Sequence, residues 1–593
     1  MSLIRRLQLD ARFVRNATRT YAMLRKVRPD SETSIADFIE ERVAAAPHRI
    51  AILFEDRKVT NAELEAAANR TARWASAQGI GRGDVVALLM ENRPEFIATW
   101  YGLAKLGAVT AMLNTHLRGH PLAHSLGVAD AKHLIVGSEL GEALVSAREH
   151  LASWPTVWAT GGALAGTEDL DAELRTRSAE PIDRAVRRGL QASEKLFYIF
   201  TSGTTGLPKA ANISHQRALL MGGGAMGAQE LGLEDRVYVP LPLYHSAGGV
   251  MAAVGALLSG GGLALARKFS ASRFWSDCTR FEATSFQYIG ELCRYLLHSP
   301  EHPDEGRHRV RVCLGNGLRP EIWEAFQERF GIPRIIEFYG ATEGNVALMN
   351  FDGKVGAVGR LPRLVRRVMG IELIRYDVAT DAHVRGRNGF CVPCKPGEVG
   401  EAIGRLSQAV RFEGYTNPEA TEKKILRNVF KTGDAYFRTG DLLRQDDDDY
   451  YYFVDRIGDT FRWKGENVAT SEVAEVLSVC PGVKEANVYG VSVPGQDGRA
   501  GMAALVVDAN FDALLLAERV KRELPAYARP LFLRLSPEIE VTGTFKHRKI
   551  DLVSDGFDPA KVPEPLFFLD AERGYVQLDA DLYGRITSGG MRV

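Results

Sequence analysis

Cysteine is scarce in this chain, and its thiols are poorly placed for cross-links. The 593 residues include six cysteines, of which only Cys391 and Cys394 lie close together. A structural zinc site needs a second such pair or histidines at ligand spacing. The pattern therefore excludes a disulfide-stapled scaffold, argues against zinc, and predicts a reducing, cytoplasmic setting.

An excess of charge of either sign is also missing. The 74 basic residues equal the 74 acidic residues, so the formal net charge is +0. A protein that binds nucleic acid relies on a basic surface to neutralise the phosphates. The composition therefore predicts no nucleic-acid partner.

Long hydrophobic runs are lacking as well. Residues 246–266 form an uncharged stretch long enough to span a membrane, but the sequence SGGG at 259–262 interrupts it. We expect a buried helix over 247–258, a turn and a strand instead of a span. The first thirty residues contain no apolar run typical of a secretory signal, so we expect no such signal.

The chain begins with a basic amphipathic segment. Residues 1–30 hold eight basic residues against Asp10 and Asp30, and Leu7 and Val14 fall on one predicted apolar helical face. Such a helix can lie on the anionic, cytoplasmic surface of a membrane. It can also dock on its own domain with its arginines solvated, and the sequence leaves both alternatives open.

Short apolar runs alternate with helical segments through most of the chain, which predicts an α/β fold with largely parallel sheets. The length exceeds that of one ordinary hydrophobic core. Strands and hairpins predominate before a compact α+β segment near the C-terminus. We expect a basic segment (1–30), a large N-terminal domain of stacked α/β sheets (31–454), a hinge (455–459) and a small, mobile C-terminal α+β domain (460–593).

The stretch YIFTSGTTGLPKAANISH at 198–215 predicts a phosphate-binding loop. It is not the common P-loop, because Leu207 and Pro208 separate Gly206 from the lysine and no hydroxyl follows Lys209. Its glycines permit a loop whose amides and hydroxyls surround phosphate oxygens, and the lysine adds a point charge. The residues expected to bind phosphate are Thr201, Ser202, Gly203, Thr204, Thr205, Gly206 and Lys209.

Further stretches follow this loop in a fixed order. They are YVPLPLYHSAGG (238–249), EFYGATEGN (337–345), FRTGDLL (437–443), DRIGDTFRWKGENV (455–468) and TGTFKHRK (542–549). Together with the loop they resemble the adenylate-forming superfamily of acyl-CoA synthetases, luciferases and peptide-synthetase adenylation domains. The segments QYIGELCRYLL (287–297) and 455–468 resemble the branch of fatty-acid transport proteins, or very-long-chain acyl-CoA synthetases, in a bacterial-type member.

The resemblance implies a two-step ligase reaction. A fatty acid and ATP give acyl-AMP and pyrophosphate, and the thiol of CoA then displaces AMP. The small domain rotates about the hinge between the two steps. ATP, Mg²⁺ and CoA are the implied cofactors and co-substrates, and the product would trap imported fatty acids as CoA esters. The oligomeric state stays open, with a homodimer as one alternative.

For the nucleotide, the resemblance implies an adenine site made by an aromatic ring and a glycine-rich loop. Tyr339 would stack on the adenine, and the loop would line the other side of the nucleotide. The residues of this site are Gly315, Asn316, Gly317, Tyr339 and Gly340.

The resemblance also implies positions for the phosphates, the metal and the ribose. Thr342 would face the α-phosphate, and Glu343 would hold Mg²⁺ with Thr204 as a further candidate ligand. Asp441 would bind the ribose hydroxyls together with Arg456. Two alternatives stay open from the residues alone, in which Glu343 is merely solvated and Asp441 belongs to an ordinary turn.

Two further catalytic roles and the position of the hinge rest on the same resemblance. Lys546 would act in adenylation, although Phe545 replaces the usual preceding glycine and Lys549 is a nearby alternative. His245 would lie between the carboxylate and the thiol, with a hydrogen-bonded core histidine as its alternative. The hinge would pivot at Gly458 or Asp459.

Two further binding segments complete the expected site. Tyr288 and Gly290 are candidates for the mouth of an acyl tunnel, because a glycine lets a backbone approach a ligand; Tyr288 could instead be a core residue. The residues expected to form the CoA passage are Lys464, Gly465, Glu466 and Asn467.

The leading interpretation is therefore a long-chain or very-long-chain fatty acid–CoA ligase. A membrane carrier that moves fatty acids without catalysis is a second interpretation, which would need membrane spans. A third is an adenylate-forming ligase for another carboxylate or for a carrier-protein thiol.

Overall fold

A computed structural model gives the fold of the chain. It describes residues 3–21, 27–151, 153–201, 207–378, 380–407, 412–464, 466–496, 498–539 and 549–591. The chain divides into two compact units. The first unit comprises Met1–Leu318, Ile322–Pro362 and Arg405–Leu426, and the second comprises Arg319–Glu321, Arg363–Gly404 and Arg427–Val593. The domain boundaries expected at residues 31, 455 and 460 stay predictions.

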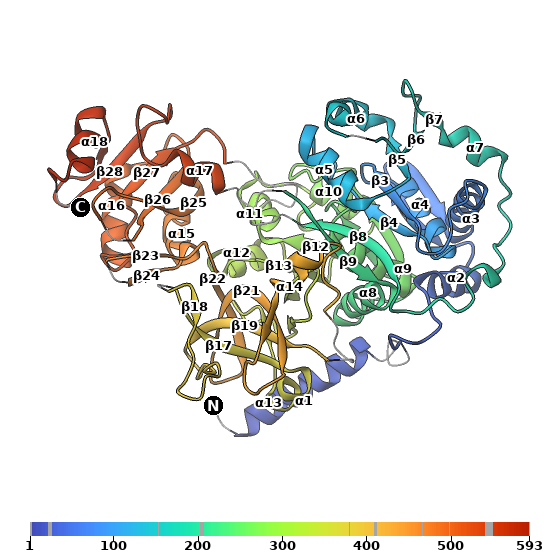
Figure 1. Cartoon of the computed structure of the whole chain (residues 1–593), viewed down its shortest axis with the longest axis horizontal. Coiled ribbons are helices and arrows are strands. Elements are labelled where there is room, and N and C mark those ends of the chain that lie inside the picture. Colours follow the sequence, from blue (N-terminus) through green and yellow to red (C-terminus); the bar gives the residue numbers. More distant parts are fainter. Residues whose placement is uncertain are drawn as a thin grey trace. The chain divides into compact units, whose positions relative to one another are not determined.

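The first unit contains two sheets built mainly from parallel strands (Figure 1). In one sheet the spatial order is β7 (Glu168–Asp169), β6 (Thr156–Thr160), β5 (His133–Gly137), β3 (Val85–Leu89), β4 (Val109–Met112), β8 (Lys195–Thr201) and β9 (Lys209–Ser214). In the other it is β16 (Gly359–Arg360), β15 (Ala347–Asn350), β14 (Ile335–Gly340), β13 (Val312–Asn316), β12 (Ser285–Ile289), β10 (Arg236–Val239), β11 (Gly262–Leu265), β1 (Ile50–Phe54) and β2 (Arg57–Thr60).

The strands of the second unit pair mostly antiparallel. Its strands are β18 (Ala382–His383), β17 (Ile371–Asp377), β19 (Val399–Arg405), β21 (Ala435–Gln445) and β22 (Tyr450–Arg456), then the hairpin β23 (Phe461–Trp463) and β24 (Glu466–Val468), and the sheet β25 (Val483–Val491), β26 (Ala500–Val507), β27 (Phe532–Leu535), β28 (Leu566–Asp570) and β29 (Gly574–Gln577). Strand β20 covers Ile425–Arg427.

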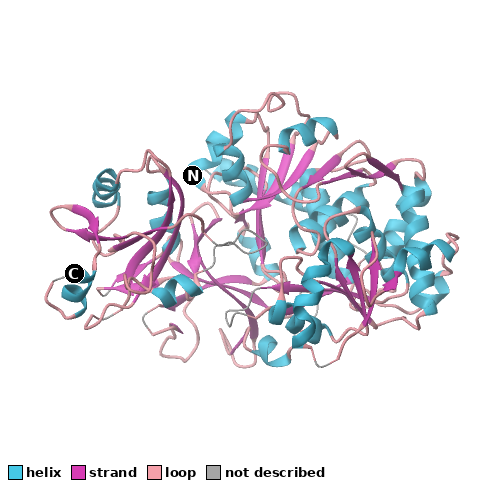
Figure 2. Cartoon of the chain, turned by 90° about the horizontal axis from the view of Figure 1, so that it is seen from above, coloured by secondary structure: helices cyan, strands magenta, loops and turns pink. Residues whose placement is uncertain are grey.

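Helices cover both faces of the parallel sheets, as Figure 2 shows. They are α1 (Leu3–Tyr21), α2 (Ile35–Ala45), α3 (Asn61–Ala77), α4 (Pro94–Lys105), α5 (Gly119–Ala129), α6 (Gly141–Ala147), α7 (Leu170–Thr176), α8 (His215–Gln229), α9 (Gly255–Ser259), α10 (Phe274–Arg280), α11 (Gly290–His298), α12 (Pro320–Arg329), α13 (Arg363–Met369), α14 (Pro418–Glu422), α15 (Thr470–Ser478), α16 (Ala513–Glu523), α17 (Ile550–Asp555) and α18 (Ala580–Thr587). The elements η1 (Ser138–Leu140), η2 (Arg148–His150) and η3 (Arg184–Arg187) are short 3₁₀ helices, and η4 (Ser246–Val254) is a π-helix.

The inner strands of the parallel sheets are buried on both faces. Strand β3 reads VVALL and β8 reads KLFYIFT, and nearly all of these side chains are inaccessible to solvent. A parallel strand covered by helices on both sides is apolar throughout instead of alternating. This is why the short apolar runs of the sequence, separated by helical segments, form an α/β fold.

The uncharged stretch 246–266 is core, as the sequence predicts. It forms the π-helix η4, helix α9 and strand β11, all of them buried. Across the part of the chain that the structure describes, no helix combines the length and the apolar character needed to cross a bilayer.

Helix α1 packs on its own unit. Asp10 forms an ion pair with Arg360, whose side chain is fully buried, and the ring of Phe13 meets that of Phe351 edge-on at 5.7 Å between centroids. The predicted apolar face is wrong, because Leu7 and Val14 are more than half exposed. The buried partners Arg360 and Phe351 select the face that carries Asp10 and Phe13 instead. Membrane association of residues 1–30 stays a prediction.

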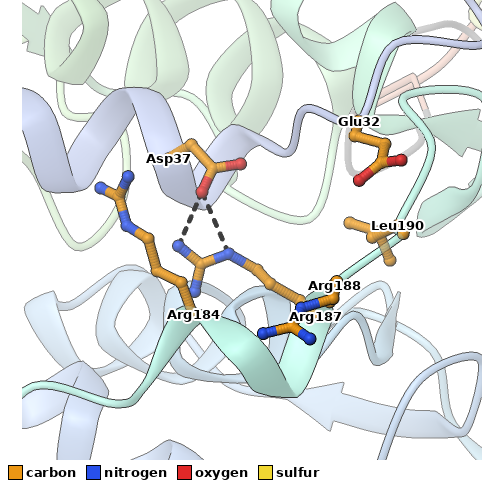
Figure 3. Close-up of a pocket in the computed structure, with 7 residues that line it drawn as sticks. Glu32, Asp37, Arg184, Arg187, Arg188 and Leu190 are labelled. Carbon is orange, nitrogen blue, oxygen red and sulfur yellow. Dashed lines mark hydrogen bonds and ion pairs between the residues drawn. The ribbon is translucent and has the colours of Figure 1, made fainter.

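A buried ion-pair network holds α2, α3, α4 and η3 together. The ammonium of Lys105 is fully buried and contacts Glu40 Oε1 at 2.8 Å and Glu65 Oε1 at 2.6 Å. Arg187 contacts Glu40 at 2.6 Å and Asp37 at 2.7 Å, and Figure 3 shows its guanidinium against the Asp37 carboxylate. Removing one partner of a buried network leaves a charge without compensation.

Lys105→Met therefore lowers the free energy of unfolding of the first unit by about 3–5 kcal/mol, measured as a shift of the urea denaturation midpoint. Arg57→Met is the matched control, because Arg57 and Glu95 form an exposed pair at 2.7 Å; its cost is about 0–1 kcal/mol. Equal shifts for the two variants would show that the buried network contributes no more than a surface pair.

Candidate functional site

The phosphate-binding stretch begins and ends on two paired strands. Strands β8 and β9 are antiparallel, and Thr201 lies opposite Lys209. The loop predicted to surround phosphate therefore starts and finishes at one end of this hairpin. Its central residues, Ser202, Gly203, Thr204, Thr205 and Gly206, lie outside the described residues.

Strand β9 is held on its other side by a segment from far along the chain. The amide of Asn212 donates to the carbonyl of Gly414, and the amide of Thr416 donates to the carbonyl of Ala210, both at 3.0 Å. Glu413 accepts hydrogen bonds from the amide and the hydroxyl of Ser214. Residues 413–416 thus extend the sheet edge beside the phosphate-binding stretch.

Thr342 follows the end of β14 and is fixed through both its backbone and its side chain. Arg217 of α8 donates to the carbonyls of Thr342 and Ala341 at 2.7 and 2.9 Å. The hydroxyl oxygens of Thr342 and Ser246 lie 3.1 Å apart. The turn after β14 is therefore tied to α8 and η4, which keeps Thr342 in one place.

The carboxylate of Glu343 is buried, so the alternative of a merely solvated turn residue does not hold. Glu343 is 8% exposed, and the hydroxyl of Tyr415 donates to its Oε1 at 2.5 Å. Burial, with the nearby Glu343 charge, holds the pKa of Tyr415 above its ordinary value. Oε2 of Glu343 has no hydrogen-bond partner among the described residues. That oxygen fits the demand of a hard cation such as Mg²⁺ for carboxylate oxygen.

The predicted adenine loop is fixed from beneath by a second buried acid, Glu337. The amides of Gly317 and Leu318 donate to its Oε1, and the hydroxyl of Tyr288 donates to Oε2 at 2.5 Å. Strand β13 places Gly315 beside Glu337 of β14. Tyr339, two residues further along β14, is half-buried. Burial raises the pKa of Glu337 to about 8.

The structure places Tyr288 and Gly290 against this same loop. Tyr288 is fully buried, which matches the alternative of a core residue. A Cβ at Gly290 would lie 1.6 Å from the carbonyl oxygen of Gly317, so the missing side chain admits that backbone. A role for the two residues in acyl binding stays a prediction.

His245 forms the start of η4. Its Nδ1 accepts a long hydrogen bond of 3.4 Å from the amide of Ala247, and its carbonyl accepts from Gly249. The side chain is half-buried. A capping role explains why a histidine stands here, and π-helical turns often occur at functional sites. Its catalytic role stays a prediction.

In the second unit, Asp441 and Arg456 lie opposite each other on β21 and β22. Nε of Arg456 is 3.8 Å from Oδ1 of Asp441. The buried carboxylate of Glu401 accepts a hydrogen bond from the amide of Gly440 at 3.0 Å, which fixes the strand just before Asp441. The pair expected to share the ribose is therefore adjacent within its own unit.

The expected hinge is organised around a buried aspartate. Asp455 accepts hydrogen bonds from the amide of Thr470 at 2.6 Å and from the hydroxyl of Thr460 at 3.1 Å. Gly458 has a φ of 98°, a conformation that L side chains rarely adopt. Lys549 donates to Asp459 at 3.1 Å and to the Thr470 hydroxyl at 2.9 Å. Lys546 lies outside the described residues.

The expected CoA segment is the tip of the hairpin β23–β24. Lys464 has a φ of 51°, and its ammonium lies 5.6 Å from the centroid of the Trp463 ring. Glu466 and Asn467 are exposed and lie opposite Trp463 and Arg462. Gly465 is outside the described residues.

A separate small cavity, of about 140 Å³, lies beside Arg187 (Figure 3). Its lining contains none of the predicted site residues, and the ion-pair network described above forms one wall. The lining residues are Glu32, Asp37, Arg184, Arg187, Arg188, Gly189 and Leu190. Within the described residues, no group of three or more His, Cys, Asp or Glu side chains is arranged to hold a metal ion.

Comparison with known proteins decides the family. Residues 39–403 match the AMP-binding enzyme family, and residues 472–546 match the AMP-binding enzyme C-terminal domain. Long-chain fatty acid transport protein 1 of Mus musculus is 44% identical over 555 residues, which cover 92% of this chain and 86% of that protein. The chain belongs to the AMP-binding enzyme family.

Solved structures agree with this membership. The o-succinylbenzoate coenzyme A synthetase of Bacillus subtilis, in complex with AMP, is 25% identical with a TM-score of 0.68, over 86% of this chain and 96% of that chain. The fatty acyl CoA synthetase of Mycobacterium tuberculosis is 25% identical with a TM-score of 0.61, over 88% and 98%. The predicted α/β fold is confirmed, and the chain is an AMP-forming acyl-CoA ligase family enzyme that binds ATP or AMP.

Several residues that shape the site of this AMP-binding enzyme were not found by sequence reasoning. Tyr415 and Arg217 contact the Thr342–Glu343 turn, and Glu337 supports the adenine loop. Glu337 does stand within the EFYGATEGN stretch, so its position next to the motif was a usable signal. Tyr415 is separated from Glu343 by 72 residues, and no local pattern joins them.

The raised pKa of Glu337 predicts a pH-dependent stability. Between the ordinary glutamate pKa and about 8, the folded protein binds more protons at this site than the unfolded chain does, so its stability falls as pH rises through this window. Glu337→Gln keeps a group that can accept from the amides but removes the titration. We expect a flatter decline of Tm with pH for this variant.

Glu324→Gln is the matched control, because Glu324 is exposed on α12. Its Tm should decline with pH as the wild type does, in differential scanning fluorimetry over the same buffers. An unchanged slope for Glu337→Gln would mean that this carboxyl does not titrate between the two values.

Proposed function

We propose that this enzyme is a fatty acid–CoA ligase that acts on long or very long chains. The observation that carries the chemistry is the turn after β14, where Arg217 and Ser246 fix Thr342 while Tyr415 holds the buried Glu343. The acyl class is supported by two names among the relatives, a long-chain fatty acid transport protein and a fatty acyl CoA synthetase.

The residues of the first unit suit attack by a carboxylate on the α-phosphate of ATP. That step brings two anions together, so charge must be neutralised as it develops. Lys209 supplies a positive charge at the end of the phosphate-binding stretch, and the Thr342 hydroxyl would face the α-phosphate. When bound through Glu343, Mg²⁺ would further neutralise the phosphate oxygens. Pyrophosphate is the leaving group, and acyl-AMP is retained.

The residues of the second unit suit the ribose contact and the transition between steps. Asp441, positioned by Glu401 and paired with Arg456, would accept hydrogen bonds from the ribose hydroxyls. Lys546 would neutralise charge during adenylation. Movement about Gly458 and Asp459 would then bring the segment of Lys464, Glu466 and Asn467 into use for CoA. The thiol of CoA attacks the acyl carbonyl, and AMP leaves.

Because the chain belongs to an enzyme family, a carrier that lacks catalysis is no longer supported. Two alternatives to a fatty acid–CoA ligase are activation of another carboxylate and transfer to a carrier-protein thiol. The following experiment distinguishes the proposed ligase from both.

Purified enzyme is given ATP and Mg²⁺ with hexanoate, palmitate or lignocerate, with and without CoA. We expect pyrophosphate release to rise from hexanoate to the longer acids, because each buried methylene contributes about 0.8 kcal/mol. Mass spectrometry should identify acyl-CoA as the product. Acyl-AMP that persists at saturating CoA would reject CoA as the acceptor, and equal rates for all acids would reject the chain-length class.

Lys546→Ala should lower acyl-AMP formation by about 100-fold or more while the variant still converts supplied acyl-AMP and CoA to the thioester. The two half-reactions are measured separately, by pyrophosphate release and by thioester formation. Lys549→Ala is the comparison, because Lys549 contacts Asp459 and Thr470. Loss of adenylation in Lys549→Ala alone would transfer the catalytic role to that lysine.

A further inference from the structure

Tyr415 contacts the predicted metal ligand directly. Its hydroxyl donates to Oε1 of Glu343 at 2.5 Å, and both side chains are less than a tenth exposed. The phenol is the donor in this pair and the carboxylate oxygen is the acceptor. The hydrogen bond therefore occupies one carboxylate oxygen and leaves Oε2 without a hydrogen-bond partner among the described residues.

The backbone of Tyr415 is itself held in place by β9. Tyr415 forms a bridge to Ala211, and the residues on either side of Tyr415 exchange hydrogen bonds with Ala210 and Asn212. Its amide also donates to the hydroxyl of Thr421 at 2.9 Å. The phenol consequently projects from a point that is defined by the same strand that follows the phosphate-binding stretch.

The ring of Tyr415 also meets Lys209, the first residue of that strand. The ammonium lies 6.0 Å from the ring centroid, at the outer limit of a cation–π contact. One side chain thus contacts the cation at the end of the phosphate-binding stretch and the carboxylate after β14. These two groups belong to different sheets of the first unit and are not linked by any short stretch of chain.

We infer that Tyr415 is a positioning residue, which orients the Glu343 carboxylate for a divalent cation and sets its place relative to Lys209. The inference rests on the proposed function, in which Glu343 holds Mg²⁺. A carboxylate that binds a metal depends on partners that fix its orientation, and removal of such a partner typically costs 10–100-fold in metal affinity.

The test uses Tyr415→Phe, which keeps the ring under Lys209 and removes the hydroxyl. Mn²⁺ replaces Mg²⁺ as the probe, with α,β-methylene-ATP and no acid, and electron paramagnetic resonance measures free Mn²⁺. We expect the affinity for Mn²⁺ with the nucleotide to fall about tenfold. The affinity for the nucleotide without metal, measured by calorimetry, should stay within about twofold, because the hydroxyl acts only on the carboxylate.

Tyr101→Phe is the matched control. Tyr101 is also buried, and its hydroxyl donates to Glu65 at 2.6 Å in the ion-pair network of α3 and α4. It should bind Mn²⁺ with the nucleotide as the wild type does. If Tyr101→Phe weakened metal binding as much as Tyr415→Phe, the effect would be a general loss of stability and the inference would be overturned.

Glu343→Gln separates this inference from the proposed function. If the wild type failed to bind Mn²⁺ with the nucleotide, or if Glu343→Gln bound it unchanged, the proposed metal role of Glu343 would fail. If Glu343→Gln lost the metal while Tyr415→Phe retained it at wild-type affinity, the metal role would stand and the positioning role of Tyr415 would be overturned. The expected order of affinity is wild type, then Tyr415→Phe, then Glu343→Gln.

Discussion

The burial of the Glu343 carboxylate is the constraint on which the arrangement of the turn after β14 and its neighbours in the first unit depends. A buried charge is costly unless it is paired or hydrogen-bonded. The structure meets that cost with the Tyr415 hydroxyl, and with Arg217, which holds the carbonyls of Ala341 and Thr342 immediately before the glutamate. Tyr415 bridges to Ala211 of β9, and Arg217 belongs to α8. Compensation of one carboxylate therefore connects the β8–β9 hairpin, the turn after β14 and helix α8.

A second buried acid, Glu337, lies within β14 and makes different contacts from Glu343. Glu337 receives hydrogen bonds from two backbone amides and from Tyr288, yet burial dominates and raises its pKa to about 8. These three donors hold Glu337 beneath the loop at 315–317. Glu343, six residues later, lies in the turn after the strand, with one oxygen that lacks a hydrogen-bond partner among the described residues. Glu337 lies within β14 and supports the loop, whereas Glu343 lies beyond the end of the strand and is a candidate ligand for metal.

The α/β class and the core character of residues 246–266 could be read from the sequence because both depend on local patterns. An apolar run such as VVALL in β3 is buried wherever helices cover a parallel sheet. Long-range pairs could not be read in this way. The apolar face predicted for α1 was wrong because contacts with Arg360 and Phe351 determine which side of the helix is buried. These partners lie more than three hundred residues away in the sequence. Tyr415 was missed for the same reason, since nothing near it in sequence points to Glu343.

The sequence leaves two candidates for the adenylation lysine, Lys546 and Lys549, and the structure describes the contacts of Lys549. Lys549 is engaged by Asp459 and by the Thr470 hydroxyl, and Thr470 in turn is held by the buried Asp455. The Lys549 ammonium connects Asp459 to Thr470. It would have to lose both hydrogen bonds before it could neutralise charge elsewhere. The cluster therefore suits Lys549 to a structural role beside Asp455 and Asp459, and the adenylation role of Lys546 stays a prediction.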